Sequence, residues 1–160
     1  MNPRVAQFAG LYKLDTHMIK KALEDVKPDD VHKRLNNTGS SLHWLAGHIL
    51  NSRYFVANLI GASKEHEFSE LFNGGQAMKE SSSYPSIEEV QKAFDSISEK
   101  LISGLENLSD ADIEKKVKEK WPHGDDTQLG AISFMCWHEG WHIGQMSVLR
   151  KHLGYKGLAG

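Results

Sequence analysis

The chain has 160 residues, enough for one domain that buries its apolar core without disulfides or a structural metal. Its 19 Lys and Arg residues nearly balance 21 Asp and Glu residues, so charge gives no indication of a nucleic-acid or anionic-membrane partner. No apolar stretch has the length of a membrane span, and the N-terminus lacks a signal-peptide pattern. These features predict a single cytoplasmic domain, residues 1–160, with a small-molecule substrate or protein partners.

Four segments repeat apolar residues at spacings of three and four, the pattern of amphipathic helices. The predicted helices cover residues 3–26, 41–61, 86–108 and 128–153. Pro28 follows the first, while Gly61 and Gly154 suit the C-terminal ends of the second and fourth. Ser86 and Glu89 form a capping box at the start of the third.

Four helices without a comparable strand pattern predict an all-α fold, a four-helix bundle. The connections after the second and third helices are each about twenty residues long, whereas bundle loops usually have about two to eight. Connections of this length allow two consecutive helices to lie parallel through a crossover. Residues 65–72 and 113–120 are expected to add short helices within them.

The segment CWHEGWHIGQ, residues 136–145, contains two histidines in the HExxH pattern of zinc peptidases. On a helix, His138 and His142 lie about 40° apart around the axis and about 6 Å apart along it, so both can reach one ion. They continue a row through Met135 and Leu149, and we expect both side chains to point into the bundle. A metal would satisfy two such imidazoles, and hydrogen-bonded core histidines are the alternative.

A zinc peptidase is not predicted, because its third ligand is missing. No Asp or Glu follows Glu139 in the chain, and Gln145 and Val148 occupy the positions of the glycine and third histidine in the extended HExxHxxGxxH motif. Glu139 lies about 100° from His138 around the helix. We therefore expect its carboxylate to be solvated or in a surface ion pair, outside the coordination of a metal.

A third ligand must come from another helix, and His48 is the best candidate. It lies in mid-helix on the edge of an apolar stripe, beside Leu45 and Ser52. His17 falls on a polar face rich in lysine, and His43 lies near a helix start and points elsewhere. The remaining histidines are expected to be solvated or to act as a C-terminal helix charge; they are His32, His66, His123 and His152.

The segments WLAGHI and HEGWHIGQMSVLRKHLG resemble the DinB/YfiT-like family of metalloenzymes over nearly the whole chain. The resemblance implies a four-helix bundle with crossover topology, frequently a homodimer. It also implies a divalent metal held by His48, His138 and His142. Characterised members of this family include thiol-cofactor-dependent S-transferases and a maleylpyruvate isomerase.

Three neutral imidazoles would leave a divalent ion its full charge and open positions for water or substrate. Zinc or nickel is the favoured ion, with iron or manganese as further candidates. The leading hypothesis is an enzyme that activates a low-molecular-weight thiol and transfers it to an electrophile. The alternatives are a hydrolase that uses metal-bound hydroxide, and a non-catalytic metal-binding or dimerising stress protein.

Several residues near the histidine pair carry further expectations. Gln145 could orient a ligand or a bound water, or bond a backbone carbonyl as a buried amide. Gly140 and Gly144 are interpreted as packing glycines that let a neighbouring helix approach. Cys136 lies about 200° from His138 around the helix and is interpreted as a packing residue.

Two arginines and three aromatic residues are candidates for contact with a cofactor or a substrate. Arg53 and Arg150 are interpreted as solvated surface residues, with contact to an anionic thiol cofactor as the alternative. Tyr12, Trp44 and Trp141 are interpreted as core residues, with the wall of a substrate pocket as the alternative.

Apolar residues on more than one face of the second and fourth helices predict a homodimer. Phe55 lies beside Leu59, and Phe134 lies beside Trp137, so a single bundle leaves apolar surface exposed. A second copy of the chain would cover it.

Overall fold

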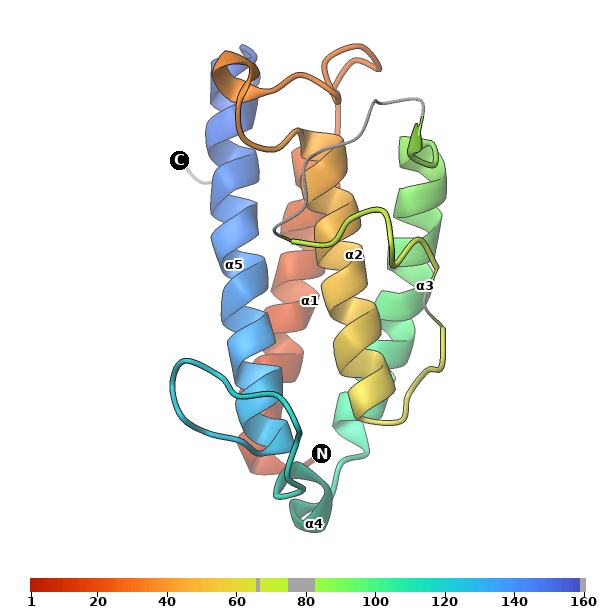
Figure 1. The fold of residues 1–160 in the computed structure, drawn as a ribbon, viewed down its shortest axis with the longest axis vertical. Helices are drawn as coiled ribbons and strands as arrows, with labels where there is room; N and C mark the ends of the chain where they lie inside the picture. The colour runs from red at the N-terminus through yellow and green to blue at the C-terminus, as the bar shows by residue number, and fades with distance from the viewer. Residues whose placement is uncertain (66, 75–82, 159–160) are drawn as a thin grey trace.

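The computed structural model describes residues 1–65, 67–74 and 83–158, and it confirms the all-α four-helix bundle (Figure 1). Its helices are α1 (Pro3–Leu23), α2 (Leu42–Leu59), α3 (Ile87–Glu106), α4 (Asp110–Ile113) and α5 (Gln128–His152), with a 3-10 turn at Leu35–Asn37. Within these ranges no helix is both long and apolar enough to cross a membrane.

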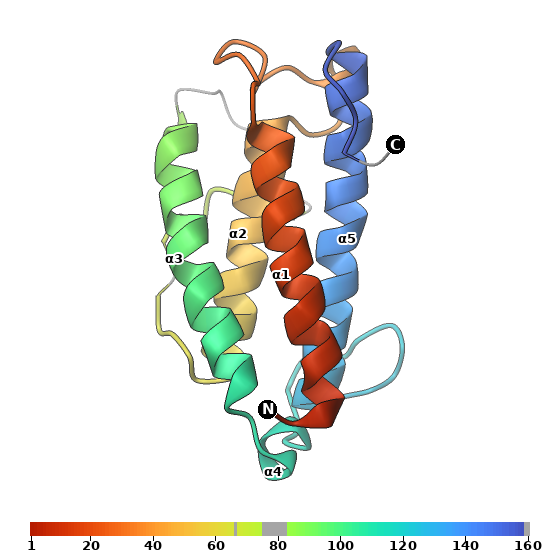
Figure 2. The ribbon, with the colours of Figure 1, turned by 180° about the vertical axis from the view of Figure 1, so that it is seen from behind.

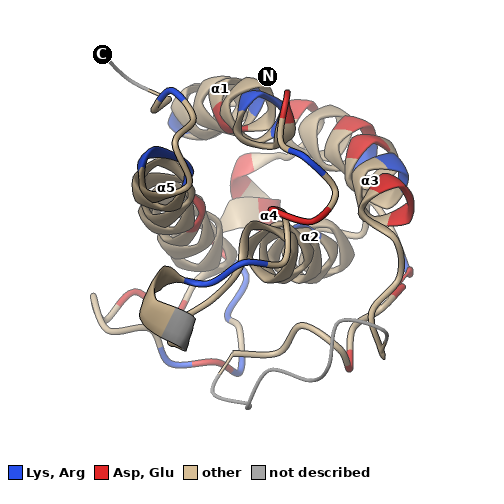
Figure 3. Ribbon diagram, turned by 90° about the horizontal axis from the view of Figure 1, so that it is seen from above, with Lys and Arg blue, Asp and Glu red and all other residues tan. Residues whose placement is uncertain are grey.

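The four long helices do not simply alternate in direction. In Figure 1, α1 and α5 run upward, whereas α2 and α3 both run downward. Seen from above, α1 lies diagonally opposite α2, with α3 and α5 on the two other corners (Figure 3). The consecutive helices α2 and α3 are therefore neighbours and parallel, as the length of the connection between them predicted.

The predicted helix starts agree closely with the structure because each has a side-chain cap. Ser41 accepts a hydrogen bond from the Trp44 amide at the start of α2, and Thr127 accepts one from Gly130 at the start of α5. The capping box of Ser86 with Glu89 is present at the start of α3.

Other boundaries differ from the sequence predictions. Helix α1 ends three residues earlier than expected, because Glu24 is extended and Asp25 has a left-handed φ of 58°. The prediction of a short helix at 65–72 is wrong, because the described residues of this range form turns and irregular structure. The one expected at 113–120 is also wrong: its only helical residue is Ile113, the last of the single turn α4, which begins at Asp110 behind its own capping box.

Helix α2 is buried on nearly every face, not along one stripe as its sequence predicted. All of residues 42–47 are buried. Helices α3 and α5 cover two sides, and the segment 67–74 crosses in front of α2 in Figure 1. The irregular connection therefore takes the place of a helix on the outer face of α2, beside His48.

Candidate metal centre

The structure brings together the three histidines that the sequence singled out. His48 extends from α2, and His138 and His142 extend from α5 one turn apart. The Nε2 atom of His138 lies 3.2 Å from that of His48 and 3.0 Å from that of His142. One ligand atom from each residue lies within 4.8 Å of the others, which makes the cluster a candidate site for a metal ion.

The opposite nitrogen of each ring faces a different partner. The Nδ1 atom of His48 lies 2.7 Å from the Phe72 carbonyl oxygen, and that of His142 lies 2.6 Å from Oε1 of Gln145. The Nδ1 atom of His138 is 3.4 Å from Oγ of Ser52. Protons on these Nδ1 atoms leave the Nε2 lone pair of each ring free to bind a metal, as in neutral imidazole ligands.

The spacing of His138 Nε2 from each of the two other Nε2 atoms fits a single ion. A tetrahedral ion about 2.0–2.1 Å from each nitrogen would hold the nitrogens about 3.3 Å apart, close to the 3.0 and 3.2 Å measured here. The Trp44 ring stacks on His48 at 4.8 Å between centroids and restricts the orientation of that imidazole. The three imidazoles therefore form a donor set that fits a divalent metal.

Burial keeps these imidazoles neutral. It lowers the pKa of His138 to about 4, and the neighbouring rings of His142 and His48 add to the effect. Burial also lowers the pKa of His48 and of His142, although the Phe72 carbonyl and the Gln145 amide oppose the shift. Neutral rings offer lone pairs to a metal and do not repel its charge.

Metal affinity should therefore persist to lower pH than the value of about 6.5 for free imidazole implies. Protons compete with a metal only as the pH falls through the lowered pKa values, about 4 for His138. Affinity should fall steeply there, because more than one ring is protonated. The metal-free fold should lose stability from about pH 6.5 downward, because the unfolded chain binds protons that the folded chain does not.

Titration of the metal against a competing chelator at a series of pH values measures the first effect, and urea unfolding of the metal-free protein measures the second. A loss of half the affinity at pH 6.5 would contradict the expected shift.

The sequence predicted that the histidine row of α5 points into the bundle. In the structure this row lies at the edge of the bundle and not in its centre. His138 and His142 are half-buried, Gln145 is exposed, and the buried row of α5 runs through Ile132, Cys136 and Ile143 instead. Gln145 is therefore no buried amide, and its side-chain oxygen contacts His142.

The other described histidines lie outside the cluster, as predicted. His17, His32, His123 and His152 are exposed, and His66 lies outside the described residues. His43 is buried and its Nδ1 atom lies 3.1 Å from Nδ1 of His32, away from the three site histidines.

Glu139 corrects a sequence expectation, because it is buried and not solvated. Its side chain is 1% exposed and pairs with Arg53, whose side chain is fully buried. Nε and one terminal nitrogen of Arg53 each donate to a different carboxylate oxygen at 2.9 Å. Burial raises the pKa of Glu139, and the Arg53 guanidinium opposes that shift. A carboxylate held in this way is not available as the general base of an HExxH peptidase.

The guanidinium of Arg53 has further partners, so the interpretation of Arg53 as a surface residue is wrong. It donates to Thr16 and Ser98, and to the Tyr12 carbonyl oxygen. A signal for this buried pair was present in the sequence. Arg53 interrupts the apolar row of α2, and Glu139 interrupts that of α5, which places opposite charges on two buried faces.

Arg150 is also buried, contrary to its interpretation as a solvated residue. Its Nη1 atom donates to the carbonyl oxygens of Ala22 and Glu24 at 2.9 Å each. Its Nε atom donates to the carbonyl oxygen of Lys156. These bonds satisfy carbonyl groups at the end of α1. Both arginines therefore have internal roles.

Cys136 and two glycines lie on α5 near the histidine pair. Cys136 is buried, as predicted, and burial raises the pKa of its thiol to about 12, which makes it unreactive. Gly140 and Gly144 are exposed, and a Cβ on either would meet nothing within 4 Å. They do not bring a neighbouring helix of this chain close, so their interpretation as packing glycines within the bundle is wrong.

The three aromatic residues occupy different places. Tyr12 and Trp44 are buried, and the Tyr12 hydroxyl donates to the Ile132 carbonyl oxygen at 3.3 Å. Trp141 is 58% exposed on α5, so its interpretation as a core residue is wrong.

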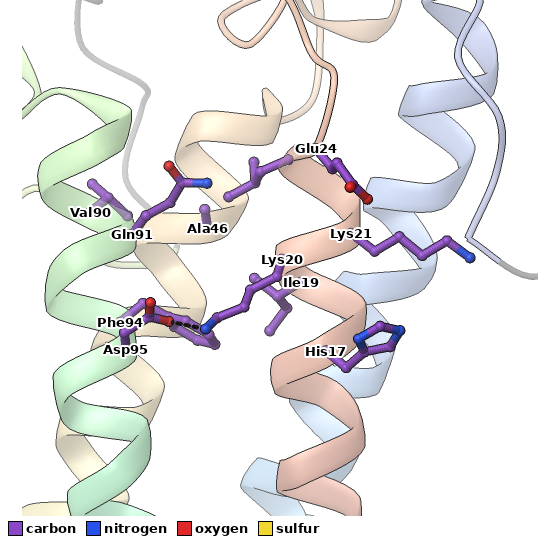
Figure 4. A pocket seen from close by; sticks show the side chains of 11 residues that line it. His17, Ile19, Lys20, Lys21, Glu24, Ala46, Val90, Gln91, Phe94 and Asp95 are labelled. Atoms are coloured by element: carbon purple, nitrogen blue, oxygen red, sulfur yellow. Dashed lines mark ion pairs between the residues drawn. The ribbon is translucent and has the colours of Figure 1, made fainter.

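A groove of about 550 Å³ lies between α1 and α3, seen from close by in Figure 4. Ile19, Ala46 and Phe94 are among its apolar lining, and Lys20 pairs with Asp95 across it at 2.9 Å. Apart from Ala46 of α2, its lining comes from α3 and from α1 and its C-terminal end. Helices α1 and α3 face the viewer in Figure 2, and none of the three site histidines lines the groove. The groove is thus separate from the candidate metal centre.

The fold and the cluster together define a four-helix bundle protein with a candidate three-histidine metal centre. Residues 11–146 match the DinB superfamily, and the chain belongs to this superfamily. No curated protein matches the sequence. Among solved structures, the chain is similar to YfiT from Bacillus subtilis, described as a probable metal-dependent hydrolase with an unusual four-helix bundle topology. The two share 13% sequence identity and a TM-score of 0.71, over 98% of this chain and 91% of that chain, which shows a common fold.

Proposed function

We propose that this protein is a metal-dependent hydrolase that acts on a small molecule and binds one divalent ion through Nε2 of His48, His138 and His142. The convergence of three Nε2 atoms, with each Nδ1 facing a separate partner, is the observation that carries the proposal. The description of YfiT as a probable metal-dependent hydrolase supports it. Zinc or nickel is the ion we propose, because both accept imidazole nitrogen.

A bound ion of this kind lowers the pKa of a coordinated water or thiol and polarises a carbonyl group. The protein's own residues hold it and keep its charge undiminished, because the three rings are neutral. Gln145 contacts His142 and, in our proposal, fixes that ring in the tautomer that presents Nε2.

Transfer of a thiol to an electrophile remains the competing hypothesis. The two arginines considered for an anionic thiol cofactor are both engaged inside the protein, Arg53 with Glu139 and Arg150 with carbonyl groups at the end of α1. This favours water over an anionic thiol as the nucleophile.

One experiment separates the hypotheses. Protein loaded with zinc or nickel is offered a panel of esters, amides and electrophiles, with and without glutathione or cysteine. A hydrolase turns over substrates without thiol and loses this activity with a chelator. Turnover that requires a thiol would support the S-transferase, and metal binding without any turnover would support a non-catalytic metal-binding protein; either result would contradict our proposal.

We also propose that the chain forms a homodimer through the outer face of α5. Trp137, Trp141 and Val148 are each more than half exposed there, beside the exposed Gly140 and Gly144. Trp121 contacts Phe55 and Phe134, so the apolar residues first noted in the sequence are partly covered by the chain itself. The exposed side chains of Trp137, Trp141 and Val148 form an apolar strip on α5, and the glycines beside it would let an identical helix approach closely.

Light scattering at tens of micromolar should give a mass of twice 18.0 kDa. Trp141→Lys should reduce it to that of one chain, because a charge would be buried in the interface. Leu14→Lys, at a residue that is 53% exposed on α1, is the matched control and should stay dimeric. A monomeric wild-type protein would exclude the dimer.

A further inference from the structure

We propose that Gly47 and Phe72 are positioning residues for His48. The missing side chain at Gly47 lets the Phe72 ring pack directly on α2, and this contact fixes the Phe72 carbonyl oxygen against Nδ1 of His48. The inference deepens the proposed function and rests on the three-histidine metal site.

Gly47 and Phe72 fit together closely. Phe72 is fully buried. A Cβ atom at Gly47 would lie 2.4–2.5 Å from three carbon atoms of the Phe72 side chain, including Cγ at the base of the ring. Such distances do not occur between real side chains, so any residue other than glycine at this position would displace Phe72.

The Phe72 ring has little freedom to turn away from an added methyl group. It stacks on Tyr84 with 5.0 Å between ring centroids, and His43 lies 5.9 Å away in a tilted arrangement. Because Cγ itself would be in the clash, rotation about the ring axis does not relieve it. The backbone of the segment around Phe72 would have to move.

Displacement of this backbone would act directly on the metal site. The Phe72 carbonyl oxygen accepts from Nδ1 of His48 at 2.7 Å. Gly74, two residues on, also borders the site, since a Cβ there would lie 3.3 Å from Cε1 of His48. The segment therefore sets both the tautomer and the space beside this imidazole.

His48 has particular need of such support. The helix fixes the relation of His138 to His142 because both lie on α5 one turn apart. His48 comes from a different helix, and its Nε2 atom must be aimed across the interface between α2 and α5. Trp44 restrains one face of its ring, and Phe72 holds its Nδ1 atom.

The test compares Gly47→Ala with Gly10→Ala, a helix glycine whose added Cβ would meet nothing within 4 Å. Zinc affinity is measured by competition with a chromophoric chelator, and helicity is followed by circular dichroism. Gly47→Ala should bind zinc roughly 10- to 100-fold more weakly, the usual effect of losing a partner of a metal ligand. Gly10→Ala should bind as the wild type does. Wild-type affinity in Gly47→Ala would overturn the proposal.

A second pair of variants shows whether the effect passes through Phe72. Phe72→Ala alone should weaken zinc binding, because the segment loses its buried anchor. The double variant Gly47→Ala/Phe72→Ala removes the clash, so its loss should be smaller than the product of the two single losses. Independent, multiplicative losses would overturn the proposed coupling. Should Gly47→Ala fail to fold, an unchanged zinc affinity in Phe72→Ala would overturn it.

Nitrogen NMR of the metal-free protein gives a readout independent of zinc. His48 should carry its proton on Nδ1 in the wild type and should populate both tautomers in Gly47→Ala and Phe72→Ala. If the wild type binds no zinc, the proposed function fails, while these spectra still decide whether Gly47 and Phe72 orient His48. A tautomer unchanged in both variants would contradict the positioning role.

Discussion

Replacement of any one of His48, His138 and His142 by alanine should remove most of the bound metal while the bundle stays folded. Each ring supplies one of three converging Nε2 atoms. Loss of one should cost more than the roughly 100-fold that a change to a ligand's partner can cost. The fold should survive because its core is built from apolar residues of all four long helices and not from the ion.

Metal content after gel filtration and circular dichroism measure the two parts of this result. His17→Ala is the matched control, because His17 is exposed on α1 and lies outside the cluster. Full metal content in His48→Ala would contradict a metal site shared between α2 and α5. Loss of metal in His17→Ala would indicate a second site.

Replacement of Glu139 by alanine should destabilise the protein strongly. From the sequence, this replacement is expected to leave metal binding and activity unchanged, because the carboxylate lies outside the coordination of the metal. In the structure it neutralises the fully buried Arg53. Leaving a buried charge without its partner typically costs about 3–5 kcal/mol of the free energy of unfolding.

Urea unfolding at pH 7 measures this cost. The double variant Arg53→Met/Glu139→Leu is the control, since removing both charges should cost far less than removing one. Glu139→Gln should retain part of the hydrogen bonding to Arg53. Its free energy of unfolding should therefore lie between those of Glu139→Ala and the double variant. A loss below about 1 kcal/mol in Glu139→Ala would be that of an exposed ion pair and would contradict the buried one.

Helix starts could be predicted from the sequence better than helix ends. Ser86 and Glu89 bond each other's backbone within one turn, so the sequence of that turn is sufficient. The end of α1 depends on Arg150, which is more than 120 residues away in the chain and bonds the carbonyl groups of Ala22 and Glu24. No local pattern contains that information.

In the candidate site, too, features set within one helix could be predicted better than contacts between distant segments. The spacing of His138 and His142 follows from helix geometry. The apolar stripe made His48 the best third candidate, and the family resemblance was needed to assign it. The contact from Phe72 is made by a backbone carbonyl in an irregular connection, which has no residue signature. The Arg53–Glu139 pair could have been found, because each charge interrupts an apolar row.

The separation of α2 and α5 along the chain limits when an ion can contact all three histidines. His48 and His138 are 90 residues apart in the chain, and α5 is synthesised after α2. Until α5 packs against α2, His48 has no second imidazole with which to share an ion, and isolated histidines bind metals weakly. An ion held by all three histidines can therefore bind only after α5 has packed against α2.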